Sequence, residues 1–181
     1  MNSDKFLDII KSRRSVRDYK PGIIPVDTIY KLTEAAQWAP TAGNLQPLEL
    51  IIVKNEDSKL ALASAAGGQE FLSECSVVFV MGANIPRTKS KYKDRGEQLY
   101  CLQDIAAATQ NVLLLAQAMN IGSCWVGAFN EKEVSKICKF PGHVRPMVMI
   151  ALGYRDAKVD IAVRPRRTKD DFVHLEVFGN K

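Results

Sequence analysis

The most restrictive feature of this sequence is a long apolar segment that follows Glu97. The pattern predicts the longest helix of the chain over residues 97–119, and its second half, from Ile105 to Ala116, is apolar nearly all round. A helix without a broad polar face must be buried on most of its sides. We therefore expect this helix to lie in the core or against another subunit, and its apolar surface favours a dimer core over residues 104–119.

The rest of the chain alternates between helical and strand-like segments. Helical spacing and helix boundary signals mark residues 4–12, 26–39, 57–66 and 132–138. Short apolar runs predict strands at 48–53, 77–81, 123–126 and 147–152, with a strand-like run at 173–178. The longest helices are too apolar to be simple surface crossovers. The pattern therefore favours a single α+β domain over 1–181, with a central mixed, mainly antiparallel sheet flanked by helices.

The polar segment from Asn84 to Gly96, which makes up most of a lid region over residues 84–100, has little apolar surface to bury. We expect it to form a mobile loop or lid. It carries five cations, Arg87, Lys89, Lys91, Lys93 and Arg95. These charges would attract the phosphates of a nicotinamide cofactor, although ordinary solvated surface charges remain the alternative interpretation.

Composition narrows the class of protein. No run approaches the roughly 20 apolar residues that a membrane span needs, and charges at the start replace the apolar run of an export signal, so we expect a cytoplasmic protein without a membrane partner. Two histidines and four scattered cysteines lack metal-ligand spacing, so we expect no metal site and buried or inert thiols. The net charge of +5 favours anionic partners, but no motif supports nucleic-acid binding.

Motifs of several large enzyme classes are missing. No G-x-G-x-x-G follows a strand and no G-x-x-x-x-G-K-[ST] is present, so neither the dinucleotide-binding fold nor the P-loop is supported. The G-x-S-x-G motif is also absent. With only two histidines, a Ser–His–Asp hydrolase is a poor fit.

Four segments carry residues from which a binding site can be built. Residues 13–17 hold three guanidinium groups and a hydroxyl, which are good donors to phosphate. Residues 39–47 combine small residues with two side-chain amides that can hydrogen-bond the edge of a flat ligand. Residues 120–127 form a glycine-punctuated strand end, and residues 164–167 are a second arginine cluster. Two distant arginine clusters make best sense if they converge on one doubly charged phosphate.

Together these segments resemble the nitroreductase family of flavoproteins. Residues 13–17 resemble its N-terminal motif, and residues 39–47 resemble its Ala-Pro-Ser-Ala-Gly-Asn-x-Gln-Pro segment. The runs 95–111 and 121–127 follow in the family's order, and the resemblance spans nearly the whole chain. It implies a homodimer with two FMN molecules at the interface. Residues 157–181 would then be an extension able to embrace the partner subunit.

The resemblance implies a set of cofactor-binding residues. They are Arg13, Arg14, Ser15, Arg17, Pro40, Thr41, Ala42, Asn44, Gln110, Val126, Gly127, Arg164 and Arg166. Arg13, Ser15 and Arg166, with Arg164 as an addition, would hold the phosphate. Arg17 would face the pyrimidine edge of the ring, where its charge stabilises the negative charge of the reduced flavin.

The remaining residues of this set would meet the flavin ring from two sides. The resemblance brings Thr41, Ala42 and Asn44 to it from the partner subunit. It directs the backbone amide of Val126, beside Gly127, at flavin N5. Thr41 stands where the family usually has Ser. Leu48 and Thr168 replace a frequent Trp and a frequent Pro, which bears on packing and substrate shape.

The implied activity is ping-pong hydride transfer through FMN. NADH or NADPH would reduce the flavin, and a small acceptor such as a nitroaromatic, a quinone or another flavin would take the electrons, without a catalytic side-chain nucleophile. Two alternatives stay open. One is other flavin chemistry on the same scaffold, such as dehalogenation or flavin fragmentation. The other is a non-catalytic basic protein that binds phosphate ligands or nucleic acid.

Overall fold

Five strands form one sheet at the centre of the molecule. The computed structural model describes residues 2–156, 158–159 and 161–181. The strands are β1 (Tyr19–Lys20), β2 (Leu48–Val53), β3 (Val77–Asn84), β4 (Gly122–Val126) and β5 (Val144–Arg155). β5 pairs with β3 on one side and with β4 and β1 on the other, and β2 lies at the outer edge beyond β3. These pairings are all antiparallel, whereas an isolated bridge between Ser15 and Ser123 is parallel.

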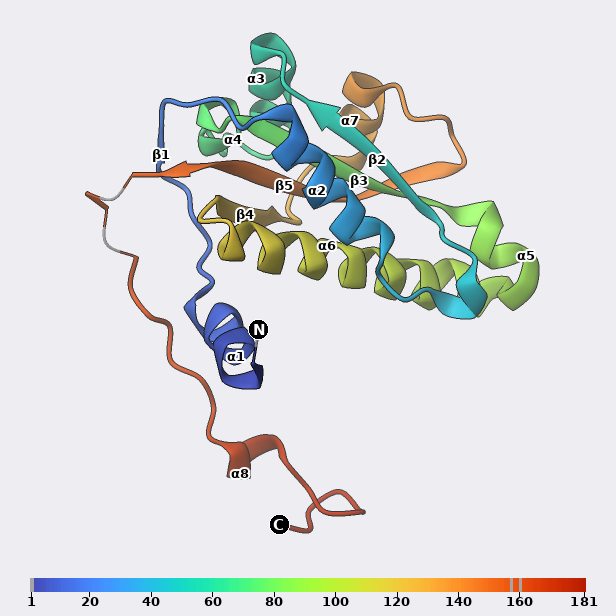
Figure 1. Ribbon diagram of the computed structural model, residues 1–181. Helices are drawn as coiled ribbons and strands as arrows, with labels where there is room; N and C mark the ends of the chain where they lie inside the picture. The colour runs from blue at the N-terminus through green and yellow to red at the C-terminus, as the bar shows by residue number, and fades with distance from the viewer. Residues whose placement is uncertain (1, 157, 160) are drawn as a thin grey trace.

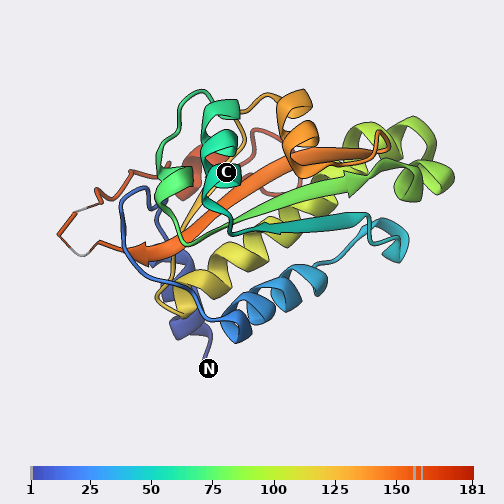
Figure 2. The ribbon, with the colours of Figure 1, turned by 90° about the horizontal axis from the view of Figure 1, so that it is seen from above.

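Helices cover both faces of this sheet (Figures 1 and 2). The α-helices are α1 (Ser3–Ser12), α2 (Val26–Gln37), α3 (Glu56–Ala65), α4 (Phe71–Glu74), α5 (Ile85–Arg95), α6 (Cys101–Ala118), α7 (Glu131–Cys138) and α8 (Lys169–Phe172). A 3-10 turn, η1 (Ala42–Asn44), precedes β2, and a π-helix, η2 (Gly96–Tyr100), joins α5 to α6. α2 and α6 lie on one face of the sheet, and α3, α4 and α7 lie on the other (Figure 1).

The central strand β3 is buried on both of its faces. Alternate side chains point to opposite faces of a sheet. Phe79 and Met81 therefore belong to the core under α2 and α6, whereas Val78 and Val80 belong to the core under α3, α4 and α7. Burial on both faces explains why this segment is a continuous apolar run rather than an alternating pattern. The predicted α+β fold with a mainly antiparallel sheet is confirmed.

The long apolar helix is buried along one side in a single chain. Ile105, Val112 and Ala116 are buried against the sheet. On the opposite side Ala107 and Leu114 are only half-buried. The expectation of burial on most sides is therefore met only in part by one chain.

Residues 85–100 are helical, which corrects the expectation of a loop, and Asn84 is the last residue of β3. α5 begins with a proline in its first turn, and η2 continues it after a kink at Lys93 (φ 51°, ψ −137°). The rings of Tyr92 and Tyr100 pack edge to face with centroids 5.0 Å apart, and Lys89 pairs with Glu97 at 2.6 Å. The charged composition of this segment gave no sign of these contacts in the sequence. The contacts pack the segment into a defined structure.

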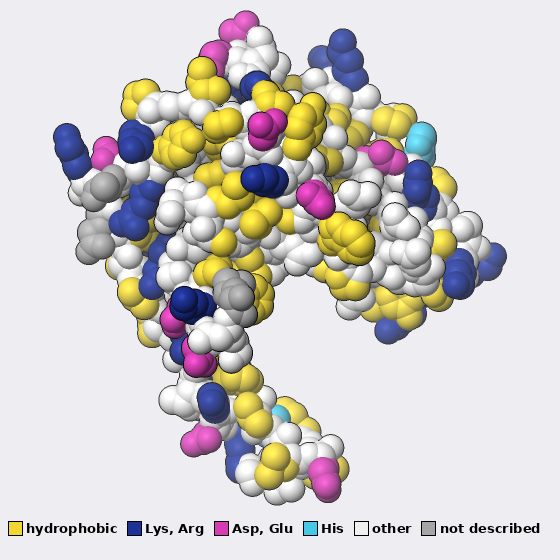
Figure 3. All heavy atoms as spheres, viewed as in Figure 1, with side chains coloured by type: hydrophobic (Ala, Val, Ile, Leu, Met, Phe, Trp, Pro, Cys, Tyr) yellow, Lys and Arg dark blue, Asp and Glu magenta, His cyan; other side chains and the backbone are white. Residues whose placement is uncertain are grey.

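The strand-like run at 173–178 is not a strand, so that prediction is wrong for a single chain. α8 and a series of bends occupy the tail, which leaves the body of the molecule (Figures 1 and 3). A strand needs a neighbour to accept its backbone hydrogen bonds, and the tail lies away from the sheet. Residues 157 and 160 of the predicted extension lie outside the described residues. Within the described part of the chain, no helix combines the length and the apolarity that crossing a bilayer requires.

Candidate functional site

The two predicted arginine clusters meet around one cavity of about 750 Å³. The loop that follows α1, one side of α6 and residues 161–166 of the tail form its wall. Its lining includes all the predicted phosphate-site residues, Arg13, Ser15, Arg164 and Arg166, together with three further predicted cofactor-binding residues, Arg14, Arg17 and Gln110. We call this space the arginine cavity. Residues far apart in the sequence therefore converge as the arginine clusters predicted.

The arginine cavity is strongly cationic. Five arginines and Lys11 line it, and the part of the chain that the structure describes contributes no carboxylate to its lining. Burial lowers the pKa of Arg13 from its ordinary value, and the charges of Arg14 and Arg166 lower it further. Cations gathered without a counter-charge repel each other, so an anion bound among them offsets an unfavourable electrostatic energy. The arrangement suits a ligand with more than one negative charge.

Backbone contacts with β4 fix the position of residues 13–17. The N–H of Val16 donates to the carbonyl of Ser123 at 2.9 Å, next to the parallel bridge between Ser15 and Ser123. A Cβ on Gly122 would lie 2.9 Å from Val16 Cγ1, so a larger residue at position 122 would push the two segments apart. Two of the predicted segments, 13–17 and 120–127, therefore lie side by side.

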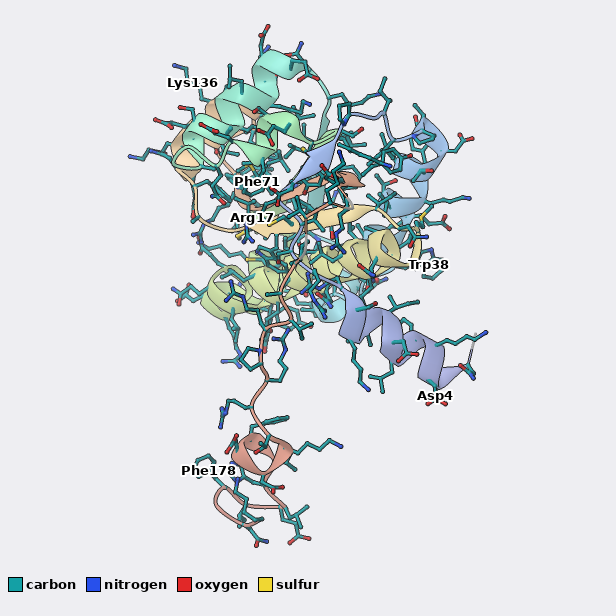
Figure 4. All side chains as sticks on the ribbon, turned by 90° about the vertical axis from the view of Figure 1, so that its left-hand side faces the viewer. Asp4, Arg17, Trp38, Phe71, Lys136 and Phe178 are labelled. Carbon is teal, nitrogen blue, oxygen red and sulfur yellow. The ribbon has the colours of Figure 1, made fainter. Side chains whose placement is uncertain are left out.

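Arg17 has a different setting from the other arginines of the cavity. Its guanidinium carbon lies 5.8 Å from the centroid of the Phe71 ring (Figure 4). This distance is in the range of a cation–π interaction, which holds a guanidinium in place without neutralising its charge. Among the described residues no carboxylate forms an ion pair with Arg17. Its positive charge therefore remains available to a ligand in the cavity.

The residues predicted to face flavin N5 do not line the arginine cavity. Val126 is buried in β4 opposite Met149, and Gly127 is exposed just after the strand. Neither residue is part of the cavity lining. Their roles remain predictions.

The predicted partner-side residues form a strained turn, which we call the 41–46 turn (Thr41 to Gln46). Three of its residues have positive φ: Gly43 at 59°, Asn44 at 57° and Gln46 at 49°. The side-chain amide of Gln46 donates to the side-chain oxygen of Asn44 at 3.1 Å. Asn44 itself is exposed, as is Pro40 just before the turn. The turn therefore presents a polar, solvent-facing edge.

One chain does not bring the 41–46 turn to the arginine cavity. Thr41 lines a separate cavity of about 370 Å³ with Asp104 and Ala108 of α6, and the two cavities share no lining residue. At about 100° per residue, Gln110 points about 200° away from Ala108 around the helix axis. The two halves of the predicted site thus lie on different sides of α6. A single chain therefore does not bring the two halves together.

The sequence of the chain matches the model of the nitroreductase family over residues 10–69 and 59–154. The chain belongs to this family. Its members include a protein of Archaeoglobus fulgidus named NADH dehydrogenase/NAD(P)H nitroreductase, which is 30% identical over 177 residues covering 96% of this chain and 98% of the relative.

Two further relatives link the family to flavin chemistry and to the fold. The FMN reductase (NADPH) of Bacillus subtilis is 26% identical over 161 residues, which cover 82% of this chain and 65% of that protein. The solved structure of B. megaterium NfrA1 has a TM-score of 0.86 and 29% identity, covering 98% of this chain and 76% of that one. The sheet and helices described above are therefore those of the nitroreductase fold.

Sequence reasoning missed three parts of this nitroreductase-family site. Phe71 supports Arg17, residues 161–163 of the tail help to line the arginine cavity, and Asp104 contacts the 41–46 turn. Only Asp104 had a usable signal in the sequence, because it is a lone carboxylate at the start of an otherwise apolar helix. The other two depend on contacts between distant segments.

Proposed function

We propose that this chain is an FMN-dependent oxidoreductase that uses NADH or NADPH to reduce a small acceptor such as a nitroaromatic, a quinone or a flavin. The arginine cavity is the observation that carries the proposal, since six cations and no carboxylate are found among its described lining residues. Membership of the nitroreductase family and relatives named FMN reductase (NADPH) and NAD(P)H nitroreductase support it.

The residues of the cavity fit the phosphate of FMN. Arg13 and Arg166 approach from opposite ends of the chain and can share its charge, and Ser15 adds a hydroxyl donor. A volume of about 750 Å³ lies within the range of cofactor and small-molecule sites. The apolar side chains of Ile10, Ala162 and Val163 form a non-polar part of the cavity wall.

Bound FMN would supply the hydride chemistry, by taking two electrons from a nicotinamide and giving them to an acceptor. The chain supplies binding and electrostatics. Arg13, Arg166 and Ser15 bind the phosphate, and Arg17, held on Phe71, provides positive charge at the edge of the ring. A nicotinamide that only visits an open site needs no nucleotide-binding fold, in agreement with the missing G-x-G-x-x-G motif.

We also propose a homodimer in which the 41–46 turn of one chain completes the site of the other. The surface of the single chain supports this, because α1 leaves Phe6, Leu7 and Ile10 more than a third exposed. The tail likewise exposes apolar side chains, with Phe178 93% exposed. Apolar surface of this extent normally marks an interface, and a tail that leaves the body can reach a second copy (Figure 3).

The proposal is tested by titrating the protein with FMN and assaying NADH and NADPH oxidation. We expect yellow holoenzyme that oxidises a nicotinamide when a quinone or nitroaromatic is supplied. Arg13→Ala and Arg166→Ala should each weaken FMN binding about ten- to a hundredfold, the usual effect of losing a charge-assisted contact. Arg145→Ala removes an arginine that pairs with Glu131 outside the cavity lining, and it should leave FMN affinity unchanged.

Different outcomes identify the alternatives. Protein that stays colourless with excess FMN contradicts the proposal, and retention of an oligonucleotide by such protein would favour the non-catalytic binding protein. Turnover of iodinated phenols but not of quinones or nitroaromatics would favour dehalogenation. Loss of the flavin spectrum during aerobic turnover would favour flavin fragmentation.

A further inference from the structure

We propose that Asp104 is a positioning residue for the flavin, because it clamps the 41–46 turn of its own subunit in the shape that reaches the cofactor of the partner. This inference rests on the proposed FMN function and on the shared site. Asp104 does not reach the cofactor in this account. It acts through the turn.

The 41–46 turn combines an unfavourable backbone conformation with internal hydrogen bonds that do not attach it to the rest of the molecule. Asn44 and Gln46 both have positive φ although neither is glycine. Such conformations are disfavoured for residues with a side chain, and they persist only where the surrounding structure enforces them. The hydrogen bonds from Gln46 to Thr41 Oγ1 and to Asn44 Oδ1 are internal to the turn, so they stabilise its shape without fixing its position.

Asp104 provides the buried attachment of the turn to the rest of the molecule. The N–H of Ala42 donates to Asp104 Oδ1 at 3.0 Å. Asp104 is only 6% exposed and belongs to α6, which packs against the sheet and is therefore a rigid support. A second attachment, from Arg87 Nη1 to the carbonyl of Gln46, is long at 3.5 Å and exposed.

α5 closes over the turn from the other side. A Cβ on Gly43 would lie 2.7 Å from Tyr92 Oη and 2.9 Å from Lys91 Nζ. The turn thus lies between the side-chain ends of Tyr92 and Lys91 on α5 and the carboxylate on α6. Because the side chains on α5 are flexible at these ends, the buried carboxylate is the firmer of the two contacts.

The chemistry of Asp104 also favours a role beyond folding. Its second oxygen, Oδ2, is buried with no hydrogen-bond partner among the described residues. A buried carboxyl oxygen without a partner lowers stability. Burial raises the pKa of Asp104 above its ordinary value, which reflects the same penalty. Asp104 therefore lowers stability at the base of a strained turn. Its presence there is explained if the turn must be held in one functional shape.

The test compares Asp104→Ala with Asp104→Asn in holoenzyme. Alanine removes the acceptor for the Ala42 N–H, so FMN should bind about tenfold more weakly, and the visible spectrum and midpoint potential at saturating FMN should shift. Asparagine keeps an oxygen acceptor at the same place, so its FMN affinity should stay within about twofold of the parent. Thr109→Val is the matched control, because Thr109 is buried one turn further along α6 and bonds within its own helix and to Met81. It should alter stability and leave the flavin unchanged.

A second variant covers the case in which Asp104→Ala does not fold. Gly43→Ala distorts the turn directly, because it combines a φ of 59° with the close contact to Tyr92, and leaves α6 intact. It should reproduce the loss of affinity and the spectral shift. If the parent binds FMN but Asp104→Ala and Gly43→Ala match its affinity, spectrum and potential, the inference is wrong and the proposed function stands. If the parent itself does not bind FMN, the proposed function fails.

Discussion

Arg17 and Arg166 both line the arginine cavity, yet their surroundings differ. Arg166 donates to the carbonyls of Arg164 and Pro165 in the tail, and its charge helps to lower the pKa of Arg13. Arg17 lies over Phe71. These settings suit two roles, a phosphate ligand for Arg166 and a positive charge at the ring for Arg17.

Arg17→Ala should lower the midpoint potential of bound FMN and slow hydride uptake even when FMN is saturating. A cation beside the ring stabilises the negative charge that develops on reduction. Arg17→Lys should restore part of the potential, since it returns the charge but not the planar fork. Arg166→Ala is the control and should weaken binding with the potential unchanged. A parental potential in the Arg17→Ala holoenzyme would remove Arg17 from the chemistry.

Asp104→Asn should make stability less dependent on pH. Burial raises the pKa of Asp104 above its ordinary value of 3.8, opposed by the hydrogen bond from Ala42. The folded chain therefore holds this proton more tightly than the unfolded chain, and stability falls as the pH rises from 3.8 through the raised pKa. The variant cannot titrate at this position, so it should gain stability relative to the parent at neutral pH.

Urea unfolding of both proteins between about pH 3 and about pH 7 measures this difference, because this range begins about one unit below the ordinary carboxyl pKa and extends well above it. The stability gap should shrink as the pH falls through that range. A gap that stays constant over the whole series would show that the titration of Asp104 is not its cause.

At the scale of secondary structure, α5 and η2 depend on a close backbone approach. A Cβ on Gly96 would lie 2.5 Å from the carbonyl oxygen of Thr88. Gly96→Ala should therefore destabilise the protein by about 1–3 kcal/mol, the usual cost of overpacking. Gly142→Ala is the control, because a Cβ there meets nothing within 4 Å. Chemical denaturation of both variants makes the comparison, and equal stabilities would contradict the packing described for this segment.

The sequence predicted the elements whose pattern is set by burial. The predicted bounds of β2 match the observed bounds. β3 and β5 were predicted as strands, but both are longer in the structure than predicted. The ends of β5 extend to exposed residues such as Arg145 and Arg155, whose side chains carry no apolar signal. The helix α5 was missed because its support comes from Tyr100 and Glu97, which follow it in the chain. β1 is only two residues long and depends on its pairing with β5.

The same limit applies to the candidate site. Motif resemblance assigned the arginines, and the cavity unites them as expected. Asp104 stands out in the sequence as a lone carboxylate in an apolar helix, but its partner could not be predicted, because the contact with Ala42 spans 62 positions. The strand predicted at 173–178 failed for a related reason, since a strand depends on a neighbour that the single chain does not provide.

At the scale of the whole molecule, the tail has two functions to test. It lines the arginine cavity through residues 161–166, and beyond them it exposes apolar side chains such as Phe172 and Val177. Deletion of residues 169–181 keeps the cavity lining and removes that apolar surface. The truncated protein should dissociate more readily in sedimentation experiments and should bind FMN more weakly, because the partner's turn is lost. A truncated dimer with parental FMN affinity would contradict a tail that embraces the partner.

The central claim is that one FMN site needs the arginine cavity of one chain and the 41–46 turn of the other. It is tested most directly by mixing two defective chains, one with Arg13→Ala and Arg166→Ala, the other with Thr41→Ala and Asn44→Ala. Each homodimer should bind FMN weakly. In the mixed dimer one site combines the intact cavity of the second chain with the intact turn of the first. FMN titration of purified mixed dimers should therefore show one site of parental affinity per dimer. If the mixed dimer has no site tighter than those of the two homodimers, the cavity and the turn do not act across the interface, and the shared-site account is wrong.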